Sequence, residues 1–195
     1  MAFIRTFSEE QAESLAQEQY NAARDNQGYV PNYVKAFSLR PEVYDAWTNL
    51  ISVIRSHIRL RRYELVTFAA AQVLECAYCM LAHGATLRKN FFSPEQMLAI
   101  IKDYRNAGLT PEEVTLMSFA RKITLEAHKV TEKDIDELRG FGLKDEEILD
   151  VILASTARNF FSKTLEAAGA VPDSVYAELE PELLQALSLG QPIEK

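Results

Sequence analysis

Residues 60–89 read LRRYELVTFAAAQVLECAYCMLAHGATLRK, and this stretch decides the fold. It contains no proline and a single glycine, Gly84, and its composition is helical throughout. Glu64 lies twelve residues before Cys76, which on one uninterrupted helix would separate the two by roughly 18 Å. We therefore expect the chain to reverse near residues 73–76, so that Glu64 and His83 come level on two antiparallel helices.

The sequence before this stretch predicts three helices. Ser8, followed by Glu9, Glu10 and Gln11, has the pattern of a capping box, and the helix that it starts is expected to end at Gly28. Residues 33–39 predict a short helix, and Pro41 is expected to open the next one. The apolar residues of this third helix recur at helical spacing and should face a core: Val43, Trp47, Leu50, Ile51 and Ile54.

The sequence after residue 89 predicts four more helices. Ser93, Thr110 and Thr131 each have the pattern of an N-cap, twice with proline at the first helical position. A long last helix should start near Lys144 and run to about Ala168. Residues 151–153 taken alone would suit a strand, but their flanks have a helical period and no hairpin signal accompanies them. We therefore predict an all-α helical bundle without a sheet.

The domain organisation follows from these elements. We expect an N-terminal helical extension over residues 1–40, a helical core over residues 41–170 and a C-terminal arm over residues 171–195. The arm is acidic and interrupted by Pro181 and Pro192, and it should lie on this subunit or on a neighbour.

A shift of 83 residues reveals an internal similarity. It aligns Glu64 with Glu147, Cys76 with Asn159, Cys79 with Ser162 and His83 with Glu166. Either the chain contains two similar helical halves, the second without thiols, or two apolar helices resemble each other by composition.

Composition and charge exclude several classes of protein. The chain has 195 residues, a formal net charge of -7 and average hydrophobic content, which indicates a globular domain without a nucleic-acid surface. The basic run at residues 59–62 is short and is expected to be a solvated helix start. No apolar stretch reaches the ~18 residues of a membrane span, and the N-terminus lacks a signal-peptide core. These features favour a cytoplasmic protein, where a structural disulfide is rare.

The two cysteines form the motif that indicates chemistry. Cys76, Cys79 and His83 stand at i, i+3 and i+7 and so share one helix face. Cysteines three apart at the first turn of a helix have Cα atoms about 5 Å apart, within disulfide range. A helix N-terminus and a nearby imidazole both lower a thiol pKa. The motif therefore predicts a redox pair, with Glu64 orienting His83 once the chain has reversed.

The pattern Glu64-x11-Cys76-x-x-Cys79-x3-His83 resembles that of the AhpD-like alkylhydroperoxidases of the carboxymuconolactone decarboxylase-like family. The resemblance extends across about residues 42–165, and residues 28–32, Gly-Tyr-Val-Pro-Asn, resemble the N-terminal extension of the peroxidase-related branch. It implies an AhpD-like helical bundle in which Cys79 is the peroxidatic thiol and Cys76 resolves its sulfenic acid. By the same resemblance Glu64 and His83 form a proton relay.

The resemblance also implies partners and one departure. An organic hydroperoxide or hydrogen peroxide would be the substrate, an external dithiol or thiol-protein would be the reductant, and the chain would form a homo-oligomer. No metal, flavin or haem is required. Tyr78 stands between the cysteines, where better studied members often have histidine. We include Tyr78 in the predicted site, but tyrosine carries a proton poorly near neutral pH, so the relay would run through water.

Four alternatives remain open from the sequence. Cys76, Cys79 and His83 would suit zinc, although a closed structural site needs a fourth ligand. A thioredoxin-like enzyme would need a strand before its Cys-x-x-Cys motif. Some relatives decarboxylate or isomerise lactone acids, although these lack the paired cysteines. In a non-catalytic oligomer both thiols would be buried packing residues. We interpret His57 and His128 as helix-end residues, and we expect the large aromatic residues to pack in the core or at a subunit interface: Trp47, Phe91, Phe92, Phe160 and Phe161.

Overall fold

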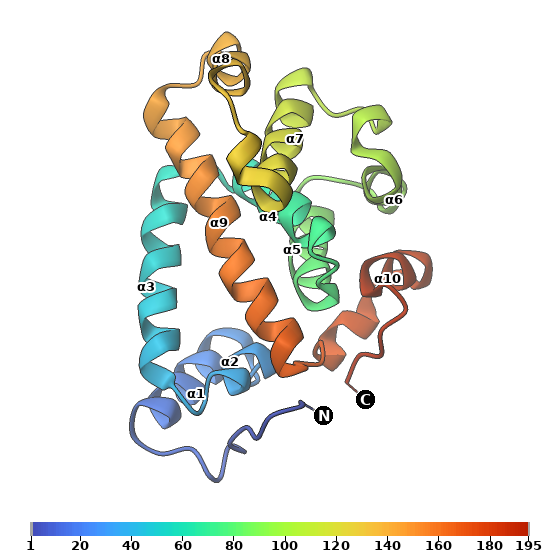
Figure 1. The fold of residues 1–195 in the computed structure, drawn as a ribbon. Helices are drawn as coiled ribbons and strands as arrows, with labels where there is room; N and C mark the ends of the chain where they lie inside the picture. The colour runs from blue at the N-terminus through green and yellow to red at the C-terminus, as the bar shows by residue number, and fades with distance from the viewer. Residues whose placement is uncertain (1, 195) are drawn as a thin grey trace.

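A computed structural model describes residues 2–194, and every regular element within them is helical (Figure 1). The all-α prediction is therefore confirmed for this part of the chain. Short 3-10 turns occur at Tyr104–Asn106, Ala127–Lys129 and Ser174–Glu178. The α-helices are α1 (Ser14–Gln27), α2 (Asn32–Ala36), α3 (Pro41–His57), α4 (Leu60–Val73), α5 (Ala77–Asn90), α6 (Pro94–Asp103), α7 (Pro111–Glu126), α8 (Glu132–Gly140), α9 (Asp145–Ala168) and α10 (Pro181–Ser188).

Helix α4 is the centre of the fold. Residues 63–71 are all buried, because α5, α7 and α9 pack around α4. A helix enclosed in this way cannot be amphipathic, which explains its apolar composition on every side. Glu64 is the one carboxylate in this buried segment, so it must find a partner inside the protein.

The predicted reversal between α4 and α5 is confirmed. Helix α4 ends at Val73, and Leu74 N–H donates to Ala70 O at 3.1 Å, while Cys76 N–H donates to Ala71 O at 3.1 Å. Glu75 between them has a φ of 51°, a left-handed conformation that costs a non-glycine residue roughly 1–2 kcal/mol. The turn makes α4 and α5 neighbours and sets Cys76 as the N-cap of α5.

The N-cap signals differed in accuracy. Ser93, Thr110 and Thr131 precede α6, α7 and α8 as predicted, each with a capping box. The predicted helix start at Ser8 is wrong. Ser8 N–H does bond Gln11 Oε1 at 3.2 Å, but this closes only a single turn. The backbone is then extended at Glu13, and α1 begins at Ser14.

One expectation about the buried face of α3 is contradicted. Val43 and Leu50 of α3 were expected in the core, yet they are 38% and 48% exposed, because only one edge of α3 faces α9 and α1.

The internal similarity does not correspond to a repeated hairpin. The residues aligned with Glu64 and His83 both lie in the single helix α9, whereas α4 and α5 are separated by a turn.

The C-terminal arm lies on this subunit. Helix α10 packs against α5 and α6 (Figure 1). The contact is close because Gly84 of α5 has no side chain. A Cβ atom there would lie 2.6 Å from Leu187 Cδ2 of α10.

The basic run at the start of α4 does not form a free cationic patch. Arg61 Nε lies 2.5 Å from Glu113 Oε1, and Arg62 contacts Glu112 at 2.8 Å and Glu147 at 2.9 Å. These ion pairs join α4 to α7 and α9. None of the helices in residues 2–194 is long and apolar enough to cross a membrane.

Candidate active site

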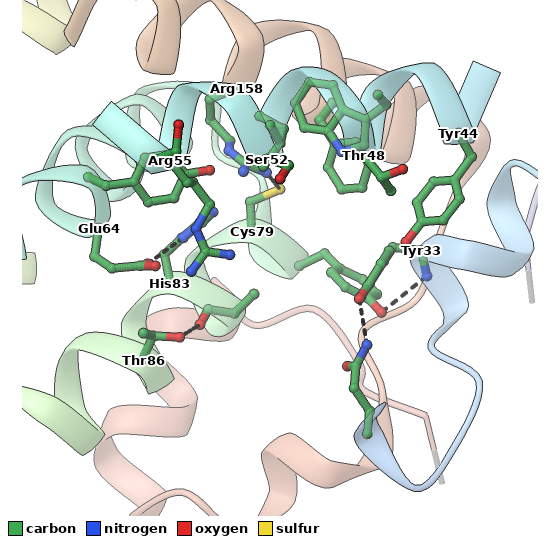
Figure 2. Close-up of a pocket in the computed structure, with 18 of the residues that line it drawn as sticks. Tyr33, Tyr44, Thr48, Ser52, Arg55, Glu64, Cys79, His83, Thr86 and Arg158 are labelled. Atoms are coloured by element: carbon green, nitrogen blue, oxygen red, sulfur yellow. Dashed lines mark hydrogen bonds and ion pairs between the residues drawn. The ribbon is translucent and has the colours of Figure 1, made fainter. Parts of the chain in front are cut away.

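Glu64 and His83 meet across the α4–α5 hairpin. Glu64 Oε2 lies 2.7 Å from His83 Nδ1, and both side chains are buried (Figure 2). The turn at residues 74–76 produces this pairing, because it returns α5 alongside α4. The geometry is that of a carboxylate that orients an imidazole.

Thr67 indicates which nitrogen of His83 carries the proton. Its hydroxyl lies 2.8 Å from Tyr63 O and 3.3 Å from His83 Nδ1. The single hydroxyl proton goes to the backbone carbonyl, so Thr67 can only accept from the ring. Both neighbours of Nδ1 are then acceptors, and in the neutral ring Nε2 is the basic nitrogen.

Cys79 lies in the first turn of α5 with its sulfur beside a buried cation. The residue is 1% exposed, and Arg158 Nη1 of α9 lies 3.5 Å from its Sγ. A hydrogen bond from the Cys76 thiol, followed by the positive charge of Arg158 and the proximity of His83, lowers the pKa of Cys79. Together they outweigh burial and bring that pKa from its ordinary value of 9.0 to about 5. These contacts favour the thiolate form of Cys79.

Cys76 has the opposite electrostatic environment. It is fully buried, and both cysteines are free thiols in this structure. Its hydrogen bond to Cys79, its burial and the negative charge of the neighbouring sulfur raise the pKa of Cys76. The pair therefore favours a thiolate at Cys79 and a thiol at Cys76.

Arg158 is a site residue that the sequence interpretation missed. It is 6% exposed and forms no ion pair with any carboxylate among the described residues. Its guanidinium lies over the rings of Phe161 and Trp47, with its carbon 5.4 and 5.9 Å from their centroids. The signal was present, because Arg158 interrupts the inward apolar stripe of α9 formed by Val151, Ala154, Phe161 and Leu165.

Tyr78 directs its hydroxyl towards the C-terminal arm. The hydroxyl donates to Asp173 Oδ2 and accepts from Tyr33 N–H at 3.2 Å. Burial is the main reason that the pKa of Tyr78 lies well above its ordinary value, and Asp173 raises it further. Asp173 Oδ1 also accepts from Asn32 N–H at 2.8 Å, so this cluster joins α5, α2 and the arm. These contacts favour an anchoring role for Tyr78 over proton transfer.

Four of the five predicted site residues line one pocket of about 850 Å³, namely Cys79, His83, Glu64 and Tyr78. Cys76 is fully buried and is not among the lining residues. Figure 2 shows Cys79 and Arg158 between the Glu64–His83 pair and the tyrosines Tyr33 and Tyr44. A ligand in the pocket can therefore reach the sulfur of Cys79 but not that of Cys76.

The two remaining histidines lie outside the pocket, and the side chains form no metal-binding cluster in the described part of the chain. His57 and His128 are exposed at the end of α3 and in the turn after α7, and neither lines the pocket. Within residues 2–194 no group of three or more His, Cys, Asp or Glu side chains is arranged to hold a metal ion.

Comparison with protein families identifies the middle of the chain. Residues 41–122 match the model of the carboxymuconolactone decarboxylase family. This segment includes α3 to α6, and therefore the hairpin that carries Glu64, both cysteines and His83. Among curated proteins the comparison found no match.

Several solved structures share the whole fold. A peroxidase-related protein from Ralstonia eutropha with an alkylhydroperoxidase AhpD core is 20% identical, with 96% of each chain covered and a TM-score of 0.81. A peroxidase-related protein from a Silicibacter species is 24% identical, with 86% of this chain and 89% of that chain covered and a TM-score of 0.77. The debrominase Bmp8 is 13% identical, with 95% and 97% covered and a TM-score of 0.74. The predicted resemblance to AhpD-like proteins is confirmed by these matches.

Proposed function

We propose, on the premise of the carboxymuconolactone decarboxylase family match over residues 41–122, that this chain is a thiol-dependent peroxidase. The AhpD-like fold supports a peroxidase-related activity at the level of the family. The finer proposal is that Cys79 reduces a hydroperoxide and that Cys76 completes the cycle. The observation that carries it is the sulfur of Cys79, held as a thiolate beside Arg158 and facing a pocket.

The reaction balances without a metal or an organic cofactor. The Cys79 thiolate attacks the distal oxygen of ROOH, the O–O bond breaks, and Cys79 becomes a sulfenic acid as RO⁻ takes a proton and leaves as ROH. The Cys76 thiol then attacks the sulfenic sulfur, forming a disulfide and releasing water. An external dithiol reduces this disulfide by exchange and leaves as its own disulfide.

The neighbouring side chains have distinct roles in this scheme. Arg158 stabilises the thiolate and the negative charge that develops on the peroxide oxygens, because a buried guanidinium acts in a low dielectric. His83, oriented by Glu64, takes the proton of Cys79 at Nε2, directly or through water, and returns it to the leaving alkoxide. Glu64 acts through His83 and is therefore a positioning residue.

The defining experiment follows peroxide consumption with dithiothreitol as the reductant. We expect Cys79→Ser to abolish turnover. In the absence of dithiothreitol we expect Cys76→Ser to reduce one equivalent of peroxide and to stop as a sulfenic acid, because this sulfenic acid has no partner thiol in the chain. Mass spectrometry of the wild type after one equivalent of hydroperoxide should show a loss of two hydrogens in the peptide that contains both cysteines. Turnover retained by Cys79→Ser would exclude this function.

We also propose that the chain forms a homo-oligomer through α3 and α9. These helices lie side by side (Figure 1), and both present apolar side chains to solvent. On α3 the residues are Val43, Leu50 and Val53, and on α9 they are Leu149, Leu153 and Phe160, each at least 38% exposed. Exposed apolar stripes on neighbouring helices are typical of subunit interfaces.

A further inference from the structure

The pocket above Cys79 has an unusual wall for a site that handles a small oxidant. Seven tyrosine, tryptophan and phenylalanine side chains line it, and the only aliphatic residues that do so are Ile51 and Ala82. One of the seven, Tyr63, stands edge-on to His83 with ring centroids 6.2 Å apart. The other six, which we call the aromatic wall, are Tyr33, Tyr44, Trp47, Tyr78, Phe161 and Tyr176.

The rings of the aromatic wall hold one another in fixed orientations. Trp47 stacks on Phe161 with centroids 4.7 Å apart, and Tyr33 stands edge-on to Phe161 at 5.9 Å. Tyr33 is also edge-on to Tyr78 at 5.9 Å. The wall is therefore formed before any ligand enters, which reduces the ordering cost of binding.

The reactive groups lie beside the aromatic wall. Arg158 contacts the sulfur of Cys79 and covers the rings of Trp47 and Phe161. In Figure 2, Tyr33 and Tyr44 lie on the side of Cys79 opposite the Glu64–His83 pair. A ligand with its peroxide at Cys79 and His83 would extend its organic group along these rings.

We propose that the preferred substrate is an arylalkyl (benzylic) hydroperoxide, with the O–O group carried on the carbon attached to the ring. This rests on the proposed peroxidase function and names the substrate class of that site. Aromatic rings favour edge-to-face and offset contacts with other rings, which an aliphatic chain cannot form. A pocket of about 850 Å³ is also much larger than hydrogen peroxide requires. The polar rim of Thr48, Ser52 and Thr86 remains open for ring substituents.

The kinetic test compares cumene hydroperoxide, tert-butyl hydroperoxide and hydrogen peroxide, with dithiothreitol as the reductant. We expect kcat/KM for cumene hydroperoxide to exceed the other two by at least about tenfold. In Trp47→Leu and Tyr44→Leu the ratio of kcat/KM for cumene hydroperoxide to that for hydrogen peroxide should fall about tenfold. Trp47→Phe should restore most of this ratio. Phe160→Leu is the matched control and should leave the ratio unchanged. The ring centroids of Phe160 and Trp47 are 5.6 Å apart, but Phe160 does not line the pocket.

A binding test separates ring recognition from turnover. Trp47 is the only tryptophan of the chain, so its fluorescence reports on the aromatic wall. In Cys79→Ser, titration with 2-phenyl-2-propanol, the alcohol product of cumene hydroperoxide, should change the emission saturably, whereas tert-butanol at equal concentration should not. Equal kcat/KM values for all three peroxides, together with no saturable change, would overturn the aryl preference and leave the peroxidase function standing. Consumption of none of the peroxides would instead refute the proposed function.

Discussion

A buried guanidinium without a carboxylate needs another anion as its partner. Arg158 contacts the sulfur of Cys79 at 3.5 Å, and its Nε has no hydrogen-bond partner among the described residues. The free energy of burying the charge is therefore offset mainly by the thiolate and by two aromatic faces. This coupling means that removing the cation should change the titration of the thiol.

The alkylation rate of Cys79 tests that coupling. A thiolate reacts and a thiol does not, so the rate with iodoacetamide should rise with pH and level off above the pKa of about 5. We expect Arg158→Met to move this midpoint upward by about one to three pH units, because an opposite charge at close range is lost. The matched control is Arg55→Met, whose guanidinium lies on the pocket rim over Tyr63. Identical midpoints in all three proteins would refute the role of Arg158.

Glu64→Gln tests the positioning of His83. The amide keeps the shape of the side chain but removes the charge that holds Nδ1–H. We expect kcat/KM for peroxide to fall at least about tenfold, and the pH profile of kcat/KM to shift. Glu112→Gln, which removes a carboxylate bound to Arg62 in the first turn of α4 and outside the pocket, should alter neither quantity. An unchanged pH profile in Glu64→Gln would show that the carboxylate is only structural.

The residues of one local motif were predictable, and those from distant segments were not. Glu64, Cys76, Cys79 and His83 lie within one hairpin, so spacing and helical geometry predict that they meet. Arg158 comes from α9, 79 residues from its partner Cys79. Its approach depends on the packing of α9 against α4 and α5, which no local pattern specifies.

At the scale of the helices, capping patterns in the sequence predicted where three of the helices begin. Ser93, Thr110 and Thr131 each cap the helix that follows. Ser8 carries the same signal but closes only an isolated turn. The difference is that residues 8–13 receive little packing from other elements, and most of them are exposed.

Two glycine substitutions test the seat of α10 on α5. At Gly84 a new methyl group would meet Leu187, so we expect Gly84→Ala to lower the free energy of unfolding by about 1–2 kcal/mol. Gly140 ends α8 with nothing within 4 Å, so Gly140→Ala should raise the same quantity by up to about 1 kcal/mol. Urea denaturation of both variants measures the two effects. If Gly84→Ala has the same free energy of unfolding as Gly140→Ala, α10 accommodates the new methyl group without loss of stability.

The whole molecule assembles its pocket from both ends of the chain and the middle. Helices α1, α2, α3, α4, α5 and α9 and the C-terminal arm all contribute lining residues. The helix inventory was predictable because each helix carries its own period and caps. The shape of the pocket was not, because it depends on how seven segments pack against one another. For the same reason, Trp47 was expected to be a packing residue, and it is one that also lines the pocket.

The proposed assembly makes a prediction for the protein as a whole. One chain has a mass of 22.1 kDa, and we expect light scattering after gel filtration to give a multiple of this value. The double variant Val53→Glu and Leu153→Glu places charges in both exposed stripes and should elute as a monomer. Leu125→Glu is the control, since Leu125 is 63% exposed at the end of α7 and belongs to neither stripe. A wild type of 22.1 kDa would refute the interface.

The burial of the two sulfurs has a consequence for how the oxidised protein is recycled. Cys76 is 0% exposed and Cys79 1% exposed, so a folded protein dithiol has no surface on which to reach either atom. In the proposed cycle, regeneration should therefore be selective for size: a slender two-thiol molecule, or an extended peptide that can enter the pocket, is admitted where a bulky domain is excluded. Access to the pocket then limits which reductants can return the protein to its reduced state.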